Sequence, residues 1–215
     1  MKGFSMSVKI IYRTLIGILF SGMAWVSSGL AAEKLEIATF AGGCFWCVES
    51  DFDGAPGVVK TISGYTGGLL KDPTYKQVSA GGTGHIEAVE IHFDPTKTTY
   101  QKLLDVLWHS VDPTDAGGQF CDRGQSYETA IFTHSDAQKR IAEASKKMLM
   151  KKAGLKEPIV TPIRVAPAFY PAETYHQNYY KKNPLRYKVY RYGCGRDARL
   201  RELWGKEALR GIEKH

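Results

Sequence analysis

Four stretches of the chain alternate hydrophobic and polar residues in the way that strands do. They are KLEIATFA at residues 34–41, GVVKTISGY at 57–65, IEAVEIHF at 86–93 and ETAIFTH at 128–134. Side chains of a strand point alternately to its two faces, so this period of two predicts strands with a buried face. The first stretch runs into Gly42 and Gly43, which indicates a tight turn, and we expect a short helix to begin near Cys44.

Hydrophobic residues recur at helical spacing between and after these strands. Asp94 and Pro95 are expected to open a helix, whose apolar positions are Tyr100, Leu103, Leu104, Leu107 and Val111. Ser135 and Gln138 have the spacing of a capping box, which predicts a further helix that ends at Gly154. The last segment predicts a helix packed on the rest of the domain; its apolar stripe is Leu200, Leu203, Trp204, Ala208 and Ile212.

The order of these elements predicts the fold. It is strand, helix, strand, strand, helix, strand, the split pattern of a ferredoxin-like plait. We therefore expect an α/β (α+β) protein of two layers, in which helices pack on a mixed and mostly antiparallel sheet. Residues 159–166, IVTPIRVA, add a strand that Pro162 restricts to the sheet edge, and the C-terminal segment is expected to be irregular.

Residues 1–32 have the features of a secretory signal peptide. Lys2, Lys9 and Arg13 come before an apolar run that ends in the small residues Ala31 and Ala32. A retained membrane anchor is the alternative, but glycines and serines interrupt the run. We expect a cleaved leader, one domain at residues 33–215, no stable membrane anchoring after cleavage, and a periplasmic location where thiols oxidise readily.

The charge of the chain indicates no particular partner. The formal net charge is +7, and loss of the leader, which holds three basic and no acidic residues, lowers it to +4. The basic residues are scattered apart from KKMLMKK at 146–152 and RYKVYRYGCGR at 186–196, which are typical of solvated faces. We expect no nucleic-acid partner.

Two of the four cysteines lie three residues apart in GCFWC, where the predicted turn meets the predicted helix. A thiol at a helix N-terminus meets the positive end of the helix dipole, so we expect Cys44 to have a lowered pKa and to be the nucleophile. Cys47, one helical turn further on, could form a redox pair with it. Two alternatives stay open: a stabilising disulfide, which so short a loop makes weak, and a zinc site, which the solitary Cys121 and Cys194 do not favour.

A carboxyl group lies on the apolar face of the predicted strand at 86–93. Glu87 is in line with Val89, Ile91 and Phe93. Burial among such side chains raises the pKa of a carboxyl group, which then holds a proton near neutral pH and can act as a general acid. The opposite face is also partly apolar, so a solvated or salt-bridged Glu87 is the alternative.

Four longer stretches resemble the signatures of the A-type peptide methionine sulfoxide reductases. They are GGCFWCVE, PTYKQVSAGGTGHIEAVEIHFDP, CDRGQSYETAIF and YHQNYYKKNP, in the same order as in the family. The similarity extends from Leu35 to about Trp204. It implies reduction of methionine sulfoxide with the S configuration at sulfur, by one catalytic domain at residues 33–215, on a two-layer plait without metal or organic cofactor.

The resemblance also implies catalytic roles. The family's catalytic cysteine falls on Cys44, its acid on Glu87 and its assisting aspartate on Asp122. Attack by a thiolate makes the sulfoxide oxygen basic, so an acid near the nucleophile is chemically required.

The residues that the resemblance assigns to the substrate are aromatic. The pocket for the sulfur-bound methyl group falls on Phe45 and Trp46, and the tyrosines that bind the sulfoxide oxygen fall on Tyr75 and Tyr127. Aromatic faces suit a methyl group and a soft sulfur atom, and phenol hydroxyls can donate to the oxygen.

Recycling is where the chain departs from its relatives. Many of these have Asn in place of Cys121 and end in a glycine-rich tail with recycling cysteines. The reaction leaves a sulfenic acid on Cys44, which a second thiol converts to a disulfide. We predict a Cys44–Cys47 disulfide first, with Cys194, which lies between two glycines, as a second step toward the surface.

The expected partners follow from this chemistry. They are methionine sulfoxide, free or in oxidised proteins, and a thioredoxin-like periplasmic thiol reductant that opens the disulfide. We expect a monomer. The competing function is a dithiol–disulfide exchange protein or isomerase that uses Cys44 and Cys47, which would need neither a buried acid nor two tyrosines.

Overall fold

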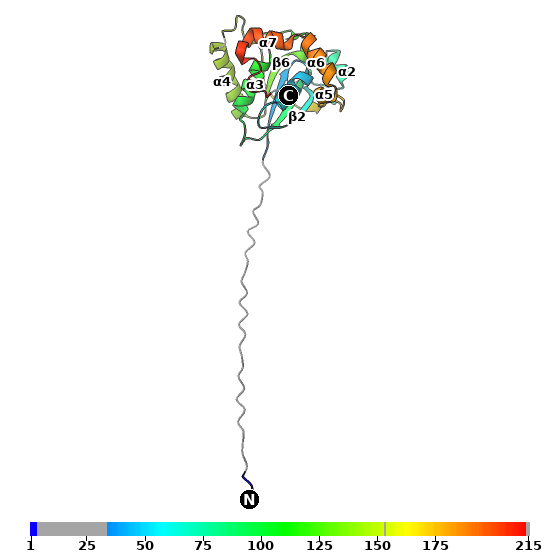
Figure 1. The fold of residues 1–215 in the computed structure, drawn as a ribbon. Helices are drawn as coiled ribbons and strands as arrows, with labels where there is room; N and C mark the ends of the chain where they lie inside the picture. Colours follow the sequence, from blue (N-terminus) through cyan, green and yellow to red (C-terminus); the bar gives the residue numbers. More distant parts are fainter. Residues whose placement is uncertain (4–33, 153, 214–215) are drawn as a thin grey trace. The chain divides into compact units, whose positions relative to one another are not determined.

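The computed structural model describes residues 1–3, 34–152 and 154–213 (Figure 1). The chain divides into two units, Met1–Ala32 and Glu33–His215, and the second contains all helices and strands of the described residues. The predicted signal peptide falls mostly on residues 4–33, which lie outside the described residues. Its cleavage therefore stays a prediction.

The centre of the second unit is a six-stranded sheet. In spatial order its strands are β7 (Ile163–Val165), β6 (Thr129–Thr133), β1 (Glu36–Gly42), β3 (Ile86–Phe93), β2 (Val58–Thr66) and β8 (Phe169–Pro171). Neighbouring strands are antiparallel, except that β6 and β7 are parallel. β7 begins after Pro162 and lies at an edge, as expected. The predicted α/β fold with a mixed, mostly antiparallel sheet is confirmed.

Seven α-helices and a small hairpin complete the described part of the domain. The helices are α1 (Phe45–Asp53), α2 (Tyr75–Ser79), α3 (Tyr100–Ser110), α4 (Asp136–Lys152), α5 (Tyr179–Lys182), α6 (Pro184–Gly193) and α7 (Arg196–Trp204). The hairpin consists of β4 (Gly118–Gln119) and β5 (Asp122–Arg123), and 3-10 turns lie at Gln125–Tyr127 and Gly205–Glu207. In Figure 1, α6 and α7, in orange and red, run along the top of the fold.

Aromatic rings attach α1 and α3 to the sheet. The ring of Phe40 on β1 lies 5.5 Å from that of Phe52 on α1 and 5.8 Å from that of Tyr100 on α3. All three side chains are buried, and large buried aromatics contribute strongly to core stability. This packing fixes the end of β1 relative to α1, and the turn that carries Cys44 lies between them.

One helix begins later than the sequence predicts. The expected start at Asp94 and Pro95 is wrong: α3 begins at Tyr100, after Thr99, whose hydroxyl accepts a hydrogen bond from the Lys102 N–H at 3.2 Å. Asp94 instead closes a separate turn, because its Oδ1 accepts from the N–H and the hydroxyl of Thr96 at 2.8 and 2.7 Å.

The C-terminal part also differs from the prediction. The expected helix to Ile212 is shorter, because α7 ends at Trp204 and Gly205 follows with φ +54°. The segment expected to be irregular contains α6, whose first residue, Pro184, suits the first turn of a helix. This helix carries residues that reach the candidate site.

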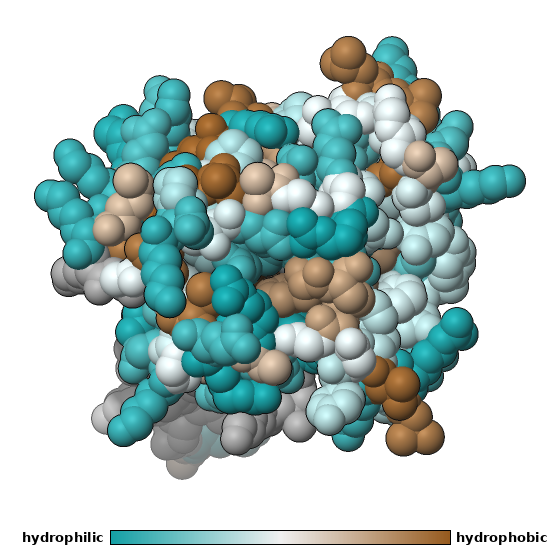
Figure 2. Space-filling view, turned by 90° about the horizontal axis from the view of Figure 1, so that it is seen from above, coloured by the Kyte–Doolittle hydropathy of each residue, from teal (hydrophilic) through white to brown (hydrophobic). Residues whose placement is uncertain are grey.

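The face of the domain on which α6 and α7 lie is mostly hydrophilic. In Figure 2 hydrophobic residues form small, separate patches between polar side chains, which is typical of a surface that meets water. Among the described residues, no helix combines the length and the apolar character needed to cross a membrane.

Candidate active site

Cys44 lies at the N-terminus of α1, directly after a turn that only glycine fits. Gly43 has φ +80°, and a Cβ there would come within 2.5 Å of the Gln119 side chain. Cys44 is the N-cap residue, and its carbonyl oxygen accepts a hydrogen bond of 3.0 Å from the Cys47 N–H. Both thiols are free and buried, so the predicted pair lies one helical turn apart in an enclosed site.

Burial reverses the expected acidity of Cys44. The helix N-terminus predicts a lowered pKa, but burial, aided by Cys47 and Glu87, raises the pKa of the Cys44 thiol well above its usual value. A hydrogen bond with Cys44 lowers the pKa of Cys47 to about 7, and the charges of Arg196 and Arg191 act in the same direction. When one of the two cysteines is ionised, the negative charge therefore lies on Cys47. The Cys47 thiolate can accept the proton of Cys44.

Glu87 is buried on β3, on the apolar face that the sequence indicates. Its Oε2 accepts a hydrogen bond of 2.9 Å from the N–H of Phe45, the residue after the nucleophile. Burial raises the pKa of Glu87 to about 8, with further contributions from Asp122 and Cys47. Glu87 therefore holds a proton at neutral pH next to Cys44, as a general acid must.

The two tyrosines that we expect to bind the sulfoxide oxygen, Tyr75 and Tyr127, lie close to Glu87. Tyr75 begins α2, Tyr127 ends the 3-10 turn, and their hydroxyls are hydrogen-bonded to each other. Burial and the nearby Glu87 raise the pKa of both phenols, and Cys44 acts on both in the same direction. Both tyrosines therefore stay protonated and can donate to an oxygen atom bound between them.

Phe45 and Trp46 form an aromatic wall together with His176. The Trp46 Nε1–H donates to His176 Nδ1 at 2.9 Å, and the Trp46 ring stacks on that of Tyr179 with centroids 3.6 Å apart. The Phe45 and Tyr75 rings lie 4.9 and 4.4 Å from the His176 ring. Burial lowers the pKa of His176, so this histidine is neutral and its Nδ1 acts as a hydrogen-bond acceptor.

Asp122 reaches the site from the hairpin. Its Oδ2 accepts a hydrogen bond of 2.5 Å from the hydroxyl of Tyr190 on α6, and that hydroxyl is also hydrogen-bonded to the Cys44 thiol. Burial raises the pKa of Asp122, whereas Tyr190 and Arg196 lower it. The sequence did not indicate Tyr190, because one more aromatic residue on a polar helix gives no signal of its own.

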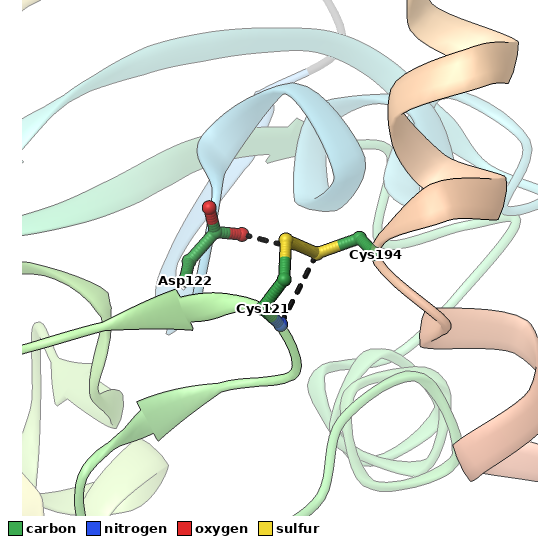
Figure 3. A group of neighbouring side chains, drawn as sticks. All are labelled: Cys121, Asp122 and Cys194. Atoms are coloured by element: carbon green, nitrogen blue, oxygen red, sulfur yellow. Dashed lines mark hydrogen bonds between the residues drawn. A yellow bond between two sulfur atoms is a disulfide. The ribbon is translucent and has the colours of Figure 1, made fainter.

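The other two cysteines form a disulfide. Cys121 and Cys194, 73 residues apart in sequence, are bonded to each other (Figure 3), and Cys44 and Cys47 are free. Cys121 is exposed. The two sulfur atoms and Asp122 lie within 4.8 Å of one another, but sulfurs joined in a disulfide are not thiolate ligands for zinc.

The sequence matches the family "Peptide methionine sulfoxide reductase" over residues 36–208. The chain belongs to this family. Two relatives carry the name peptide methionine sulfoxide reductase MsrA. The one from Bacillus licheniformis is 56% identical over 82% of this chain and 97% of its own, and the one from Bacillus subtilis is 56% identical over 81% and 98%.

Two solved structures share the fold. Reduced Mxr1 from Saccharomyces cerevisiae matches with a TM-score of 0.65 and 33% identity, over 70% of this chain and 87% of its own. Methionine sulfoxide reductase A of Corynebacterium diphtheriae matches with a TM-score of 0.63 and 35% identity, over 72% and 78%. In this chain, the Cys44 thiol, the Glu87 carboxyl group and the hydroxyls of Tyr75 and Tyr127 lie around one position that is lined by aromatic rings.

Proposed function

We propose that this chain reduces the S epimer of methionine sulfoxide, free or in proteins, to methionine by thiol chemistry. The observation that carries this proposal is the surroundings of Cys44: a protonated Glu87 and two hydrogen-bonded tyrosine hydroxyls, Tyr75 and Tyr127. The aromatic wall at Phe45 and Trp46 suits a methyl group next to a soft sulfur atom.

The groups of the site account for each step. Cys47 accepts the proton of Cys44, and the resulting thiolate attacks the sulfoxide sulfur while Tyr75 and Tyr127 donate to the oxygen. Glu87 protonates that oxygen as it develops negative charge. As the bond between the two sulfur atoms and the S–O bond of the substrate break, methionine leaves and the hydroxyl group passes to Cys44 as a sulfenic acid. The Cys47 sulfur then attacks that of Cys44: the S–O bond breaks, the proton that Cys47 had accepted leaves with the hydroxyl group as water, and the Cys44–Cys47 disulfide forms, which an external dithiol reduces.

A peptide with both sulfoxide epimers tests this function. Reduced enzyme without added reductant should convert only the S epimer, to about one methionine for each Cys44–Cys47 pair. Chiral chromatography of the products and a count of remaining thiols measure the result. Conversion of the R epimer, or thiol loss without methionine, would contradict the proposal.

The dithiol–disulfide exchange function is less well supported. Exchange between thiols and disulfides needs neither a general acid nor a pair of phenol donors, whereas a protonated Glu87 and the Tyr75 and Tyr127 hydroxyls surround Cys44. Scrambled disulfide substrates should therefore not be rearranged by the reduced protein.

Cys47→Ser should separate chemistry from recycling. Steady-state turnover with a protein dithiol should fall by about 10-fold or more, because without Cys47 the sulfenic acid lacks its nearest thiol. Methionine formation in the first turnover should continue, more slowly, since the variant also lacks the group that accepts the proton of Cys44. Rapid-quench kinetics and peptide mapping would follow both steps, and full turnover in the variant would assign resolution to another thiol.

We also propose that the enzyme is exported and acts in the periplasm with a thioredoxin-like reductant. The basic start and apolar run of residues 1–32 support this proposal. Expression in a bacterium with a periplasm should give a mature protein that begins near residue 33 and is released by osmotic shock. N-terminal sequencing of that fraction would show an intact leader if the proposal is wrong.

A further inference from the structure

The Cys121–Cys194 disulfide is the redox group that the proposed mechanism does not use. Cys121 lies at the turn of the β4–β5 hairpin and Cys194 at the end of α6 (Figure 3). Cys121 is exposed and Cys194 is half-buried, whereas both thiols of the Cys44–Cys47 pair are buried. The disulfide therefore joins two surface segments beside the site.

Both segments contribute one half of a hydrogen bond in the active site. Asp122 follows Cys121 directly, and Tyr190 lies one helical turn before Cys194. Their side chains form the 2.5 Å hydrogen bond between phenol and carboxylate. The Cys121 N–H donates to Cys194 Sγ at 3.2 Å, and Asp122 Oδ2 lies 3.7 Å from that sulfur. The disulfide thus closes a small ring of contacts around the Asp122–Tyr190 pair.

This pair faces the nucleophile. The Tyr190 hydroxyl is hydrogen-bonded to the Cys44 thiol as well as to Asp122. The Tyr190 ring also lies edge-on to Trp46, with centroids 5.7 Å apart. A shift of Tyr190 or Asp122 would therefore change both the polar and the aromatic surroundings of Cys44.

A buried arginine connects the same two segments to the turn before Cys44. Arg196, at the start of α7, lies over the ring of Phe120, 4.7 Å from its centroid. Its Nη1 donates to the carbonyl of Gly42 at 3.0 Å and its Nη2 to that of Ser110 at 2.8 Å. Movement at the disulfide would be transmitted through Arg196 to the end of β1.

We propose that Cys121 and Cys194 are positioning residues: their disulfide holds Asp122 and Tyr190 against Cys44, and opening it slows the chemical step. This proposal rests on the proposed function. Opening consumes two electrons and two protons from an external dithiol, which becomes a disulfide while both cysteines become thiols. The enzyme then works fastest where the Cys44–Cys47 disulfide is reduced and the Cys121–Cys194 disulfide is not.

The predicted second recycling step assigns Cys194 a different role. As a relay, the outer pair would pass its electrons inward, so an enzyme with four thiols would form two methionines without added reductant. As a positioning disulfide it passes none, and the same enzyme forms one. Stoichiometry therefore separates the two roles.

The central experiment removes the disulfide in two backgrounds. The variant Cys121→Ser/Cys194→Ser should form methionine about 10-fold more slowly in a single turnover, within the ~10²-fold loss that a displacement of about 1 Å can cause. When Asp122→Asn is already present, the same two changes should cause little further loss, because residues that act through one another are not additive. Rates are measured well below the unfolding temperature of each variant.

Arg123→Ala is the matched control. Arg123 lies on the same hairpin and pairs with Asp115, so this change perturbs the hairpin without touching Asp122 or Tyr190. It should leave the single-turnover rate unchanged. If the double serine variant does not fold, Cys121→Ala/Cys194→Ala is measured in its place.

Three results would contradict the proposed positioning role of the Cys121–Cys194 disulfide. A wild-type rate in the variant, even with a lowered Tm, would show a purely stabilising disulfide and overturn the proposal. An equal further loss in the Asp122→Asn background, or two methionines per reduced wild-type protein, would also overturn it. If the proposed function itself is wrong, wild-type enzyme forms no methionine at all, which is a distinguishable result.

Discussion

Cys44→Ser should abolish methionine formation from methionine sulfoxide. A serine hydroxyl is almost fully protonated at neutral pH, and Cys47, whose pKa is about 7, is too weak a base to activate it. An attacking oxygen also cannot take over the sulfoxide oxygen as a sulfenic acid. Single-turnover formation of methionine from a sulfoxide peptide should fall to the level without enzyme.

The serine change is small, so the fold should survive. Cys44 caps α1 through backbone contacts, without a side-chain capping bond, and serine suits an N-cap position. Circular dichroism and Tm should stay close to those of the wild type. Residual turnover of more than a few per cent would assign the attack on sulfur to another thiol, with Cys47 the first to examine.

Glu87→Gln should slow the chemical step by about 10²-fold or more, which is the usual contribution of general acid catalysis. The amide has the shape of the carboxyl group and can still accept the hydrogen bond from the Phe45 N–H, but it has no proton to give. Folding should change little, because no buried charge is created. Rapid-quench measurement of methionine formation isolates this step from recycling.

The pH profile provides a second readout of the same residue. Because the pKa of Glu87 is raised to about 8, its acid form is fully present below that pH and is lost as the pH rises through it. The wild-type single-turnover rate should therefore fall on the alkaline side of about pH 8, and this fall should be missing in Glu87→Gln. An unchanged rate and profile in the variant would make Glu87 structural and point to Tyr75 or Tyr127 as the proton source.

The strands and the main site residues could be predicted from local patterns. A period of two marks β1, β2, β3 and β6, because each has a face that must be buried. The same period placed Glu87 among buried hydrophobic residues, and the glycine pair placed Cys44 at a helix start. Helix boundaries were less reliable: Asp94 and Pro95 resemble a helix start, but Thr99 provides the cap that is used.

The acidity of the thiols depended on three-dimensional burial. The dipole of α1 is a local property that sequence spacing reveals, and it predicts a lowered pKa for Cys44. Desolvation depends on every residue packed around the sulfur atom, wherever that residue lies in the sequence. In the folded protein it outweighs the helix dipole and raises the pKa of Cys44. The two arginines that lower the pKa of Cys47 come from α6 and α7, almost 150 residues away in the sequence.

What the sequence alone determined was the chemistry near each motif: a thiol after a tight turn, a second thiol one helical turn later, and a carboxyl group on an apolar strand face. Only the tertiary structure decided which distant groups surround them. It paired Cys121 with Cys194, although both look solitary in the sequence, and it brought Tyr190 to Asp122 and Cys44. The reason is physical: spacing fixes neighbours within a helix or strand, whereas contacts across 70 residues depend on how the sheet, the hairpin and the C-terminal helices pack together.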